Sequence, residues 1–138
     1  MLTRFAIAEG SMRPALCPGE YVVAVRTKRP PRRGEIIVYE HPTGFHVVKR
    51  IIGLPGETIE VADGSVWLGG TRLHEPWTSG STEGALALDL GPGEAYVLGD
   101  VRTGSTSDSR QIGPIRIHPA WWRVVGRYWP LGRFGSVS

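Results

Sequence analysis

Short runs of apolar and β-branched residues, bounded by glycine, proline or charged residues, recur along the whole chain. Such runs are typical of β-strands, because branched and aromatic side chains pack well on a pleated surface. A first strand is expected in the apolar run 5–8, and further strands are expected at 21–25, 35–39, 45–52, 58–61, 95–98 and 123–129. The pattern predicts no long helix and only one helical turn, around 119–122.

The tripeptide Pro-Gly-Glu occurs at 18–20, 55–57 and 92–94, each time just before a predicted strand. Proline presets the first angle of a type II turn, and glycine takes the positive φ that follows. Asp63-Gly64 and Gly69-Gly70 are dipeptides typical of tight hairpins. The sequence therefore predicts an all-β fold, mainly antiparallel, in the form of a coiled sheet or a barrel with little helix.

A length of 138 residues fits one domain with a core of its own. We expect a single domain over 1–138, in which 57–95 are a hairpin-rich segment and 77–84 a surface loop. The one cysteine, Cys17, excludes an internal disulfide. No stretch of this sequence reaches the roughly 18 apolar residues of a membrane span, and none has the pattern of a signal peptide.

The net charge of +3 is mildly basic, and it favours an anionic partner without requiring one. Five basic side chains stand close together between two predicted strands: Arg26, Lys28, Arg29, Arg32 and Arg33. They form either a solvated loop or a surface for anionic lipid, at roughly 1 kcal/mol per basic residue. Four aromatic side chains near the end of the sequence either join such an interface or close the core: Trp121, Trp122, Trp129 and Phe134.

Ser11 and Lys49 are candidates for chemistry, although each has a simpler interpretation. Ser11 follows an apolar run and a glycine, where most serines form only local hydrogen bonds. Lys49 lies within a predicted strand, where most lysines face solvent. With a pKa near 10.4, only about one lysine in 2,500 is neutral at pH 7. Burial depresses that pKa by up to roughly 3–5 units, and a neutral amine can then activate a serine.

Several blocks of sequence, in their order along the chain, resemble the signal peptidase I family. The blocks cover nearly the whole chain and lie at 10–16, 18–20, 33–38, 49–57, 98–102, 108–110, 113–114 and 125–130. The resemblance implies a serine endopeptidase with a β-ribbon fold, present here as a catalytic domain without its membrane anchor. Residues 57–95 would be a reduced form of the inserted second domain of larger relatives.

The resemblance implies that Ser11 is the nucleophile and Lys49 the general base, as in the bacterial type of the family. The backbone N–H of Ser11 would also bind the oxyanion. His46 is expected on the opposite face of the strand from Lys49 and has no catalytic role. Six further side chains would support the loop beside the dyad: Asp100, Arg102, Ser105, Thr106, Asp108 and Arg110.

The chain departs from the family pattern at several of these positions. One extra residue stands between Gly99 and Asp108, so either Ser105 or Thr106 could supply the hydroxyl that orients Lys49. Glu9 occupies a position from which a hydroxyl can donate to the oxyanion. A carboxylate cannot donate there, and the loss of one such donor typically costs roughly 2.7–4 kcal/mol. Val101 replaces the usual asparagine, and Ala15 replaces a hydroxyl residue.

The substrate would be the signal peptide of a secreted preprotein, cut after small residues in an Ala-x-Ala pattern. Shallow apolar pockets for those residues are expected at Ile7, Met12, Val47 and Val48. The expected location is the extracytoplasmic face of a bacterial cell membrane, with the cytoplasm as the alternative. We expect neither cofactor nor metal and no nucleic acid partner.

Two other functions fit the sequence less well. A soluble family member could mature one dedicated precursor, as small relatives do for a nickel superoxide dismutase. A non-catalytic basic β module could bind nucleic acid or an anionic surface through 26–33, and its affinity would fall steeply with salt.

Overall fold

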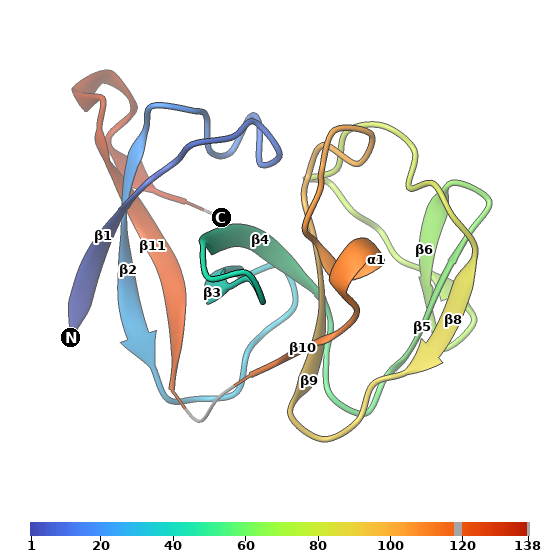
Figure 1. The fold of residues 1–138 in the computed structure, drawn as a ribbon. Helices are drawn as coiled ribbons and strands as arrows, with labels where there is room; N and C mark the ends of the chain where they lie inside the picture. Colours follow the sequence, from blue (N-terminus) through green and yellow to red (C-terminus); the bar gives the residue numbers. More distant parts are fainter. Residues whose placement is uncertain (118–119, 138) are drawn as a thin grey trace.

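The computed structural model describes residues 1–117 and 120–137, which form two antiparallel sheets lying side by side (Figure 1). The larger sheet has the strand order β1-β2-β11-β3-β4-β9-β10, with β12 paired to β11, and the smaller sheet has the order β7-β6-β5-β8. The strands are β1 Leu2–Ala6, β2 Tyr21–Thr27, β3 Ile36–Glu40, β4 His46–Gly53, β5 Thr58–Ala62, β6 Ser65–Leu68, β7 Thr71–Arg72, β8 Leu86–Asp89, β9 Glu94–Leu98, β10 Ile115–Arg116, β11 Trp121–Trp129 and β12 Gly135–Ser136.

The predicted all-β class is confirmed, and the larger sheet is the coiled sheet rather than the barrel. It begins at β1 and ends at β10, and no pairing between these two strands closes it within the described residues. Two register shifts in the pairing of β11 with β2 mark bulges, which increase the local twist. The smaller sheet lies within the predicted hairpin-rich segment 57–95, and both predicted hairpins are present.

The recurring Pro-Gly-Glu tripeptides have a structural reason. In each of them the glycine has a positive φ, and the glutamate side chain accepts a hydrogen bond from the backbone N–H three residues earlier. Arg32 to Glu35 form a fourth turn of this kind without a proline. The glutamate therefore closes the turn that leads into the next strand.

The helical turn expected around 119–122 is wrong for its last two residues. Trp121 and Trp122 open β11, where they pair with Thr27 and Arg26 of β2, and residue 119 lies outside the described part. The one-turn helix α1 forms instead at Ser109–Ile112, and a 3₁₀ turn, η1, spans Leu131–Arg133. Asp108 caps α1 in a capping box with Gln111, a signal that the sequence analysis did not use.

The four aromatic side chains near the C-terminus divide into two groups. Trp121 is buried, and Trp122 packs against the buried cluster between β1, β2, β3 and β11. Trp129 and Phe134 are 51% and 70% exposed. The first two therefore complete the core, and the last two do not.

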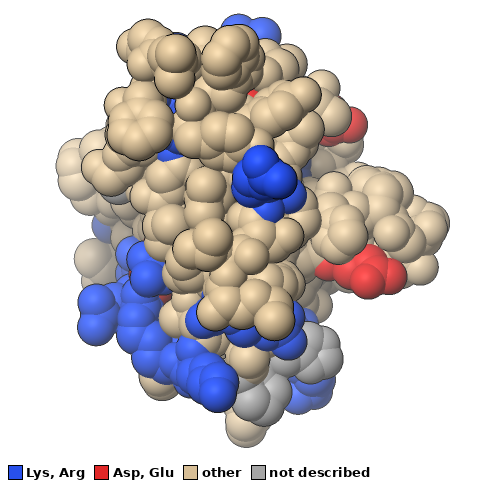
Figure 2. Space-filling model, turned by 90° about the vertical axis from the view of Figure 1, so that its left-hand side faces the viewer, with Lys and Arg blue, Asp and Glu red and all other residues tan. Residues whose placement is uncertain are grey.

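The basic loop 26–33 and the exposed aromatic side chains lie at opposite ends of the β2–β11 pair. Trp121 pairs with Thr27 at one end of that pair, and Trp129 pairs with Tyr21 at the other. Figure 2 shows basic side chains gathered at the lower end of this face and few charged residues at the upper end. Arg29 and Arg33 form ion pairs with Glu35 and Glu57. The two groups are therefore separated along the β2–β11 pair, and the predicted lipid surface stays a prediction.

Candidate active site

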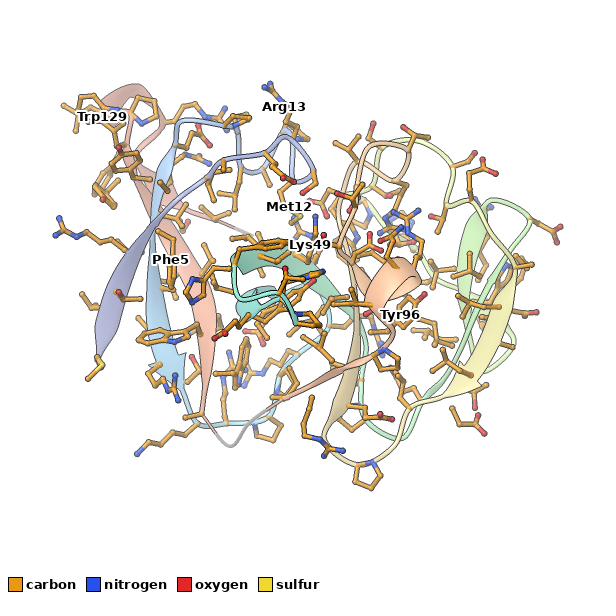
Figure 3. The ribbon with its side chains drawn as sticks, viewed as in Figure 1. Phe5, Met12, Arg13, Lys49, Tyr96 and Trp129 are labelled. Carbon is orange, nitrogen blue, oxygen red and sulfur yellow. The ribbon has the colours of Figure 1, made fainter. Side chains whose placement is uncertain are left out.

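Ser11 and Lys49, which are 38 residues apart in the sequence, meet in the interior of the larger sheet. The Lys49 Nζ donates a hydrogen bond of 2.7 Å to the Ser11 Oγ. Lys49 is 1% exposed and Ser11 7%. Lys49 projects from β4, and Ser11 lies in the loop that connects β1 to β2. Figure 3 shows Met12, the residue after the serine, beside Lys49.

The loop of Ser11 is fixed by backbone hydrogen bonds at both ends and at the serine. Ile7 and Glu20 pair at the base of the loop through a bond of 2.8 Å from the Ile7 N–H to the Glu20 carbonyl. The Val101 N–H donates to the Ser11 carbonyl, also at 2.8 Å. A Cβ atom at Gly99 would lie 3.1 Å from that carbonyl and 2.1 Å from the Ser105 Oγ. Glycine at this position is therefore what lets the two loops approach each other.

The environment of Lys49 favours the neutral amine. Burial lowers the pKa of Lys49, and the positive charge of Arg110 lowers it further. The carboxylates of Asp108, Glu9 and Asp100 act in the opposite direction, without reversing the shift. A lysine with a lowered pKa that already contacts a hydroxyl has the geometry and the proton affinity of a general base.

Asp108 connects the loop beside the dyad to helix α1. Its carboxylate accepts hydrogen bonds from the Ser105 Oγ at 2.8 Å and from the Gly99 N–H at 3.2 Å, and it pairs with Arg110 at 2.9 Å. Burial alone would raise the pKa of Asp108, but the hydrogen bonds from Arg110 and Ser105 outweigh burial and lower it. Asp108 therefore stays ionised and holds this loop in one conformation.

Two further arginines hold the segment before that loop. Arg50 pairs with Asp100 through two hydrogen bonds of 2.9 and 2.7 Å, and both side chains are almost fully buried. The Arg102 Nε donates to the Gly99 carbonyl at 2.8 Å. Val101 stands between Asp100 and Arg102 in the sequence, and its N–H binds the Ser11 carbonyl. The contacts of Asp100 and Arg102 therefore hold Ser11 in place indirectly.

A groove of about 230 Å³ leads away from the dyad. Its walls contain all four residues predicted to bind substrate, together with the dyad and part of the 103–107 loop: Ile7, Met12, Val47, Val48, Ser11, Lys49, Thr106 and Ser107. Most of the groove lining is apolar. His46 is exposed, its ring lies 5.6 Å from that of Phe5, and it also lines the groove, so its expected lack of a catalytic role stays a prediction.

The backbone N–H of Ser11 makes no hydrogen bond within residues 1–117 and 120–137, so it is available to a developing oxyanion. Glu9 is exposed and lies in the wall of the same groove. The arrangement thus brings together a serine hydroxyl, a buried amine, a backbone N–H without a partner in the described residues, and a mostly apolar groove. Together these groups can transfer an acyl group to a serine.

The family model for signal peptidases, described as signal peptidase, peptidase S26, matches residues 1–129. The chain belongs to this family. It is 36% identical to signal peptidase I of Leptolyngbya laminosa, over 79% of this chain and 58% of that protein. It is 30% identical to signal peptidase I of Bacillus caldolyticus, over 97% of this chain and 83% of that protein. The chain therefore spans little more than half of the first relative.

The fold matches that of a solved signal peptidase I as well. The crystal structure of a signal peptidase I from Enterococcus faecalis V583 aligns with 81% of this chain and 99% of its own, with a TM-score of 0.57 and 26% identity. The resemblance stated from the sequence is confirmed, and with it the serine endopeptidase class to which signal peptidases belong. No helix in the described residues is long and apolar enough to cross a membrane.

Ser105 and Thr106 occupy different environments. Ser105 is buried and donates to Asp108, whereas Thr106 is exposed in the groove wall. The only hydrogen bond recorded for the Lys49 Nζ among the described residues goes to Ser11. The geometry favours Ser105 as the hydroxyl tied to the scaffold, and its predicted effect on Lys49 stays a prediction.

Several residues that support the site carry no signal in the sequence. Tyr39 donates from its hydroxyl to the Ser107 carbonyl at 2.7 Å. Glu75 pairs with Arg102, and the ring of Trp77 lies 5.0 Å from the Arg50 Cζ. These contacts join segments that are far apart in the sequence, and no local motif announces them. The predicted surface loop 77–84 is accordingly wrong in part, because Thr82 in it is 2% exposed and binds Arg102 at 2.9 Å.

Proposed function

We propose that this chain cleaves signal peptides with Ser11 as nucleophile and Lys49 as general base. The observation that carries the proposal is the 2.7 Å hydrogen bond between the two buried side chains, at the end of a narrow groove, in a member of the signal peptidase family. Family membership disfavours the non-catalytic basic module.

The reaction follows from the positions of these atoms. The Ser11 Oγ attacks the scissile carbonyl carbon while its proton passes to the neutral Lys49 Nζ. The Ser11 N–H stabilises the resulting oxyanion. The Lys49 ammonium then protonates the leaving amine, and an ester to Ser11 remains. Water, deprotonated by Lys49, attacks that ester and regenerates the serine.

The groove supports cleavage after small residues. The groove next to the dyad is lined by three side chains that are each at most 7% exposed: Ile7, Met12 and Val47. Alanine side chains at the last position before the cut and two positions earlier would fill such shallow pockets. A bulky residue would have to displace well-packed side chains, which typically costs about 1–3 kcal/mol.

The test uses a peptide that spans an Ala-x-Ala cleavage site. The variants Ser11→Ala and Lys49→Ala should each lower kcat/KM by roughly 10³-fold or more, because the members of a catalytic unit fail together. Ser136→Ala and Lys28→Ala change exposed residues outside the groove and should cleave like the unmodified chain. Cleavage that survives in either dyad variant, with circular dichroism showing an intact fold, would refute the assignment.

Membrane contact is the second part of the proposal. The signal peptidase family acts at the extracytoplasmic side of membranes. Trp129, Leu131 and Phe134 are exposed, and the segment that follows β11 lies at the same end of the molecule as the loop between β1 and β2 (Figure 1). Arg133 of that segment donates to the Pro14 carbonyl at 2.9 Å. We propose that these side chains rest on the lipid, and co-sedimentation with anionic and with neutral vesicles tests both the contact and its charge dependence.

The soluble alternative, a cytoplasmic enzyme that matures one dedicated precursor, makes a different prediction for substrates. A general signal peptidase should cleave a panel of unrelated Ala-x-Ala peptides at similar rates. A dedicated enzyme should cleave only one of them efficiently.

A further inference from the structure

Glu9 is a charged residue at the rim of the groove that the proposed reaction does not use. It is exposed, it lies two positions before the candidate nucleophile, and its carboxylate is close enough to act on the charge of Lys49. No ion pair or hydrogen bond of its side chain is present within residues 1–117 and 120–137. An unpaired carboxylate at this place is available to a substrate.

No basic side chain forms an ion pair with that carboxylate in the described part of the chain. Lys49 is buried and favours the neutral form. Arg13 folds back against Gly10, where its Nε would lie 2.9 Å from an added Cβ, but its side chain points away from Lys49 (Figure 3). Glu9 is the one carboxylate in the groove lining, which otherwise contains Lys49, the exposed His46 and mostly apolar or uncharged groups.

We propose that Glu9 is a specificity residue that favours substrates with a basic side chain next to the scissile bond. This inference rests on the proposed function, because it assigns a preference to the same groove. In an extended peptide, alternate side chains point in opposite directions. If the last residue before the cut and the one two positions earlier point into the groove, the residue between them faces the rim. The first residue after the cut passes the same rim beyond Ser11.

The expected size of the preference is modest, because Glu9 is exposed. Charge pairs of this kind change affinities by roughly 2- to 5-fold at low salt. Glu9 should attract a lysine in the substrate and repel a glutamate, so the two effects add in the ratio between the two peptides. The ratio of kcat/KM between a lysine and a glutamate peptide should therefore reach roughly 3- to 20-fold. The ratio should shrink towards one as the ionic strength rises to 1 M, because salt screens exposed charges.

The experiment uses six Ala-x-Ala peptides that carry Lys, Gln or Glu either at the middle position of that motif or at the first position after the cut. The unmodified chain should prefer Lys over Glu at one or both positions. Glu9→Gln should remove the preference, and Glu9→Lys should reverse it. Glu83→Gln removes an exposed glutamate outside the groove and should leave the Lys-to-Glu ratio unchanged.

The outcomes separate this inference from the proposed function. If no peptide is cut at all, the proposed function fails. If the neutral peptides are cut but the Lys-to-Glu ratio is the same in the unmodified chain and in Glu9→Gln, only the role of Glu9 is overturned. A preference that persists unchanged at 1 M salt would also overturn it, because the cause would then be shape rather than charge.

Discussion

The charge state of one amine, the Lys49 Nζ, decides whether the proposed reaction can run. The ammonium form cannot accept the serine proton, and burial disfavours that form. Three carboxylates partly restore it: Asp108, Glu9 and Asp100. Asp108 and Asp100 are fixed in buried ion pairs with arginines, whereas Glu9 is exposed and unpaired in the described part of the chain. Glu9 is therefore the residue through which the pKa of Lys49 can be changed without breaking the scaffold.

The first prediction concerns the dependence of cleavage on pH. For the unmodified chain, kcat/KM should rise with pH and level off above the pKa of Lys49, which burial lowers from its ordinary value. Glu9→Gln removes a carboxylate that raises this pKa, so the rising limb should move to lower pH. The measurement is the pH profile of kcat/KM with an uncharged peptide. A flat profile from pH 6 to 9, or a shift of the limb to higher pH in Glu9→Gln, would argue against Lys49 as the base.

Among the structural elements, the 103–107 loop contributes Thr106 and Ser107 to the wall of the groove and leads through Asp108 into helix α1. Ser107 has a φ of 61°, an uncommon conformation for a residue other than glycine. Its carbonyl is held by the Tyr39 hydroxyl, and the next residue, Asp108, caps α1. The wall is therefore fixed from β3 on one side and from the helix on the other.

A pair of tyrosine variants tests this support. Tyr39→Phe removes the bond to Ser107 and should lower the free energy of unfolding by about 0.5–1.5 kcal/mol. It should also reduce kcat more than it changes KM, because the wall carries Asp108 near Lys49.

Tyr96→Phe is the matched control, since the Tyr96 hydroxyl is buried and has no hydrogen-bond partner in the described residues. That variant should be as stable as the unmodified chain or more stable. Urea unfolding and steady-state kinetics give the two readouts, and equal behaviour of the two variants would contradict the role of Tyr39.

The strands were predictable from the sequence because their signals are local. Branched residues and Pro-Gly-Glu turns mark most strands whatever they pair with, although the first strand, expected at 5–8, lies at Leu2–Ala6, and β8, β10 and β12 were not predicted. Trp121 and Trp122 misled the prediction, because their place in β11 is set by pairing with β2 and by burial rather than by local pattern. The meeting of Ser11 and Lys49 came from the family resemblance and not from residue spacing. The contacts of Tyr39 and Glu75 depend on partners 68 and 27 residues away, which no local pattern specifies.

At the scale of the whole molecule, the smaller sheet supports the candidate site in the larger one. The segment that leads from β7 to β8 runs beside the residues just before the 103–107 loop, where Ser79 and Val101 form a parallel bridge. Arg102 reaches across to Glu75, and both side chains are nearly inaccessible. Trp77 covers the guanidinium of Arg50. Val101 bridges to Ser79, and its N–H binds the Ser11 carbonyl. The segment between β7 and β8 is therefore connected to Ser11 through Val101.

The last prediction tests that connection through the Arg102–Glu75 pair. Glu75→Ala leaves a buried guanidinium without its carboxylate, which typically costs about 3–5 kcal/mol of unfolding free energy. Cleavage should also slow, because Arg102 holds the Gly99 carbonyl next to the loop of Ser11. Glu60→Ala, an exposed glutamate on β5, should change the stability by no more than about 0.5 kcal/mol.

A double variant separates the loss of the pair from the burial of an unpaired charge. Arg102→Met combined with Glu75→Leu removes both charges, so it should be more stable than Glu75→Ala. Its cleavage rate should nevertheless stay low, since the bond from Arg102 to the Gly99 carbonyl is gone. Urea denaturation followed by circular dichroism, with peptide cleavage in parallel, measures both quantities. If Glu75→Ala unfolds at the same urea concentration as Glu60→Ala, the smaller sheet does not support the site through this pair.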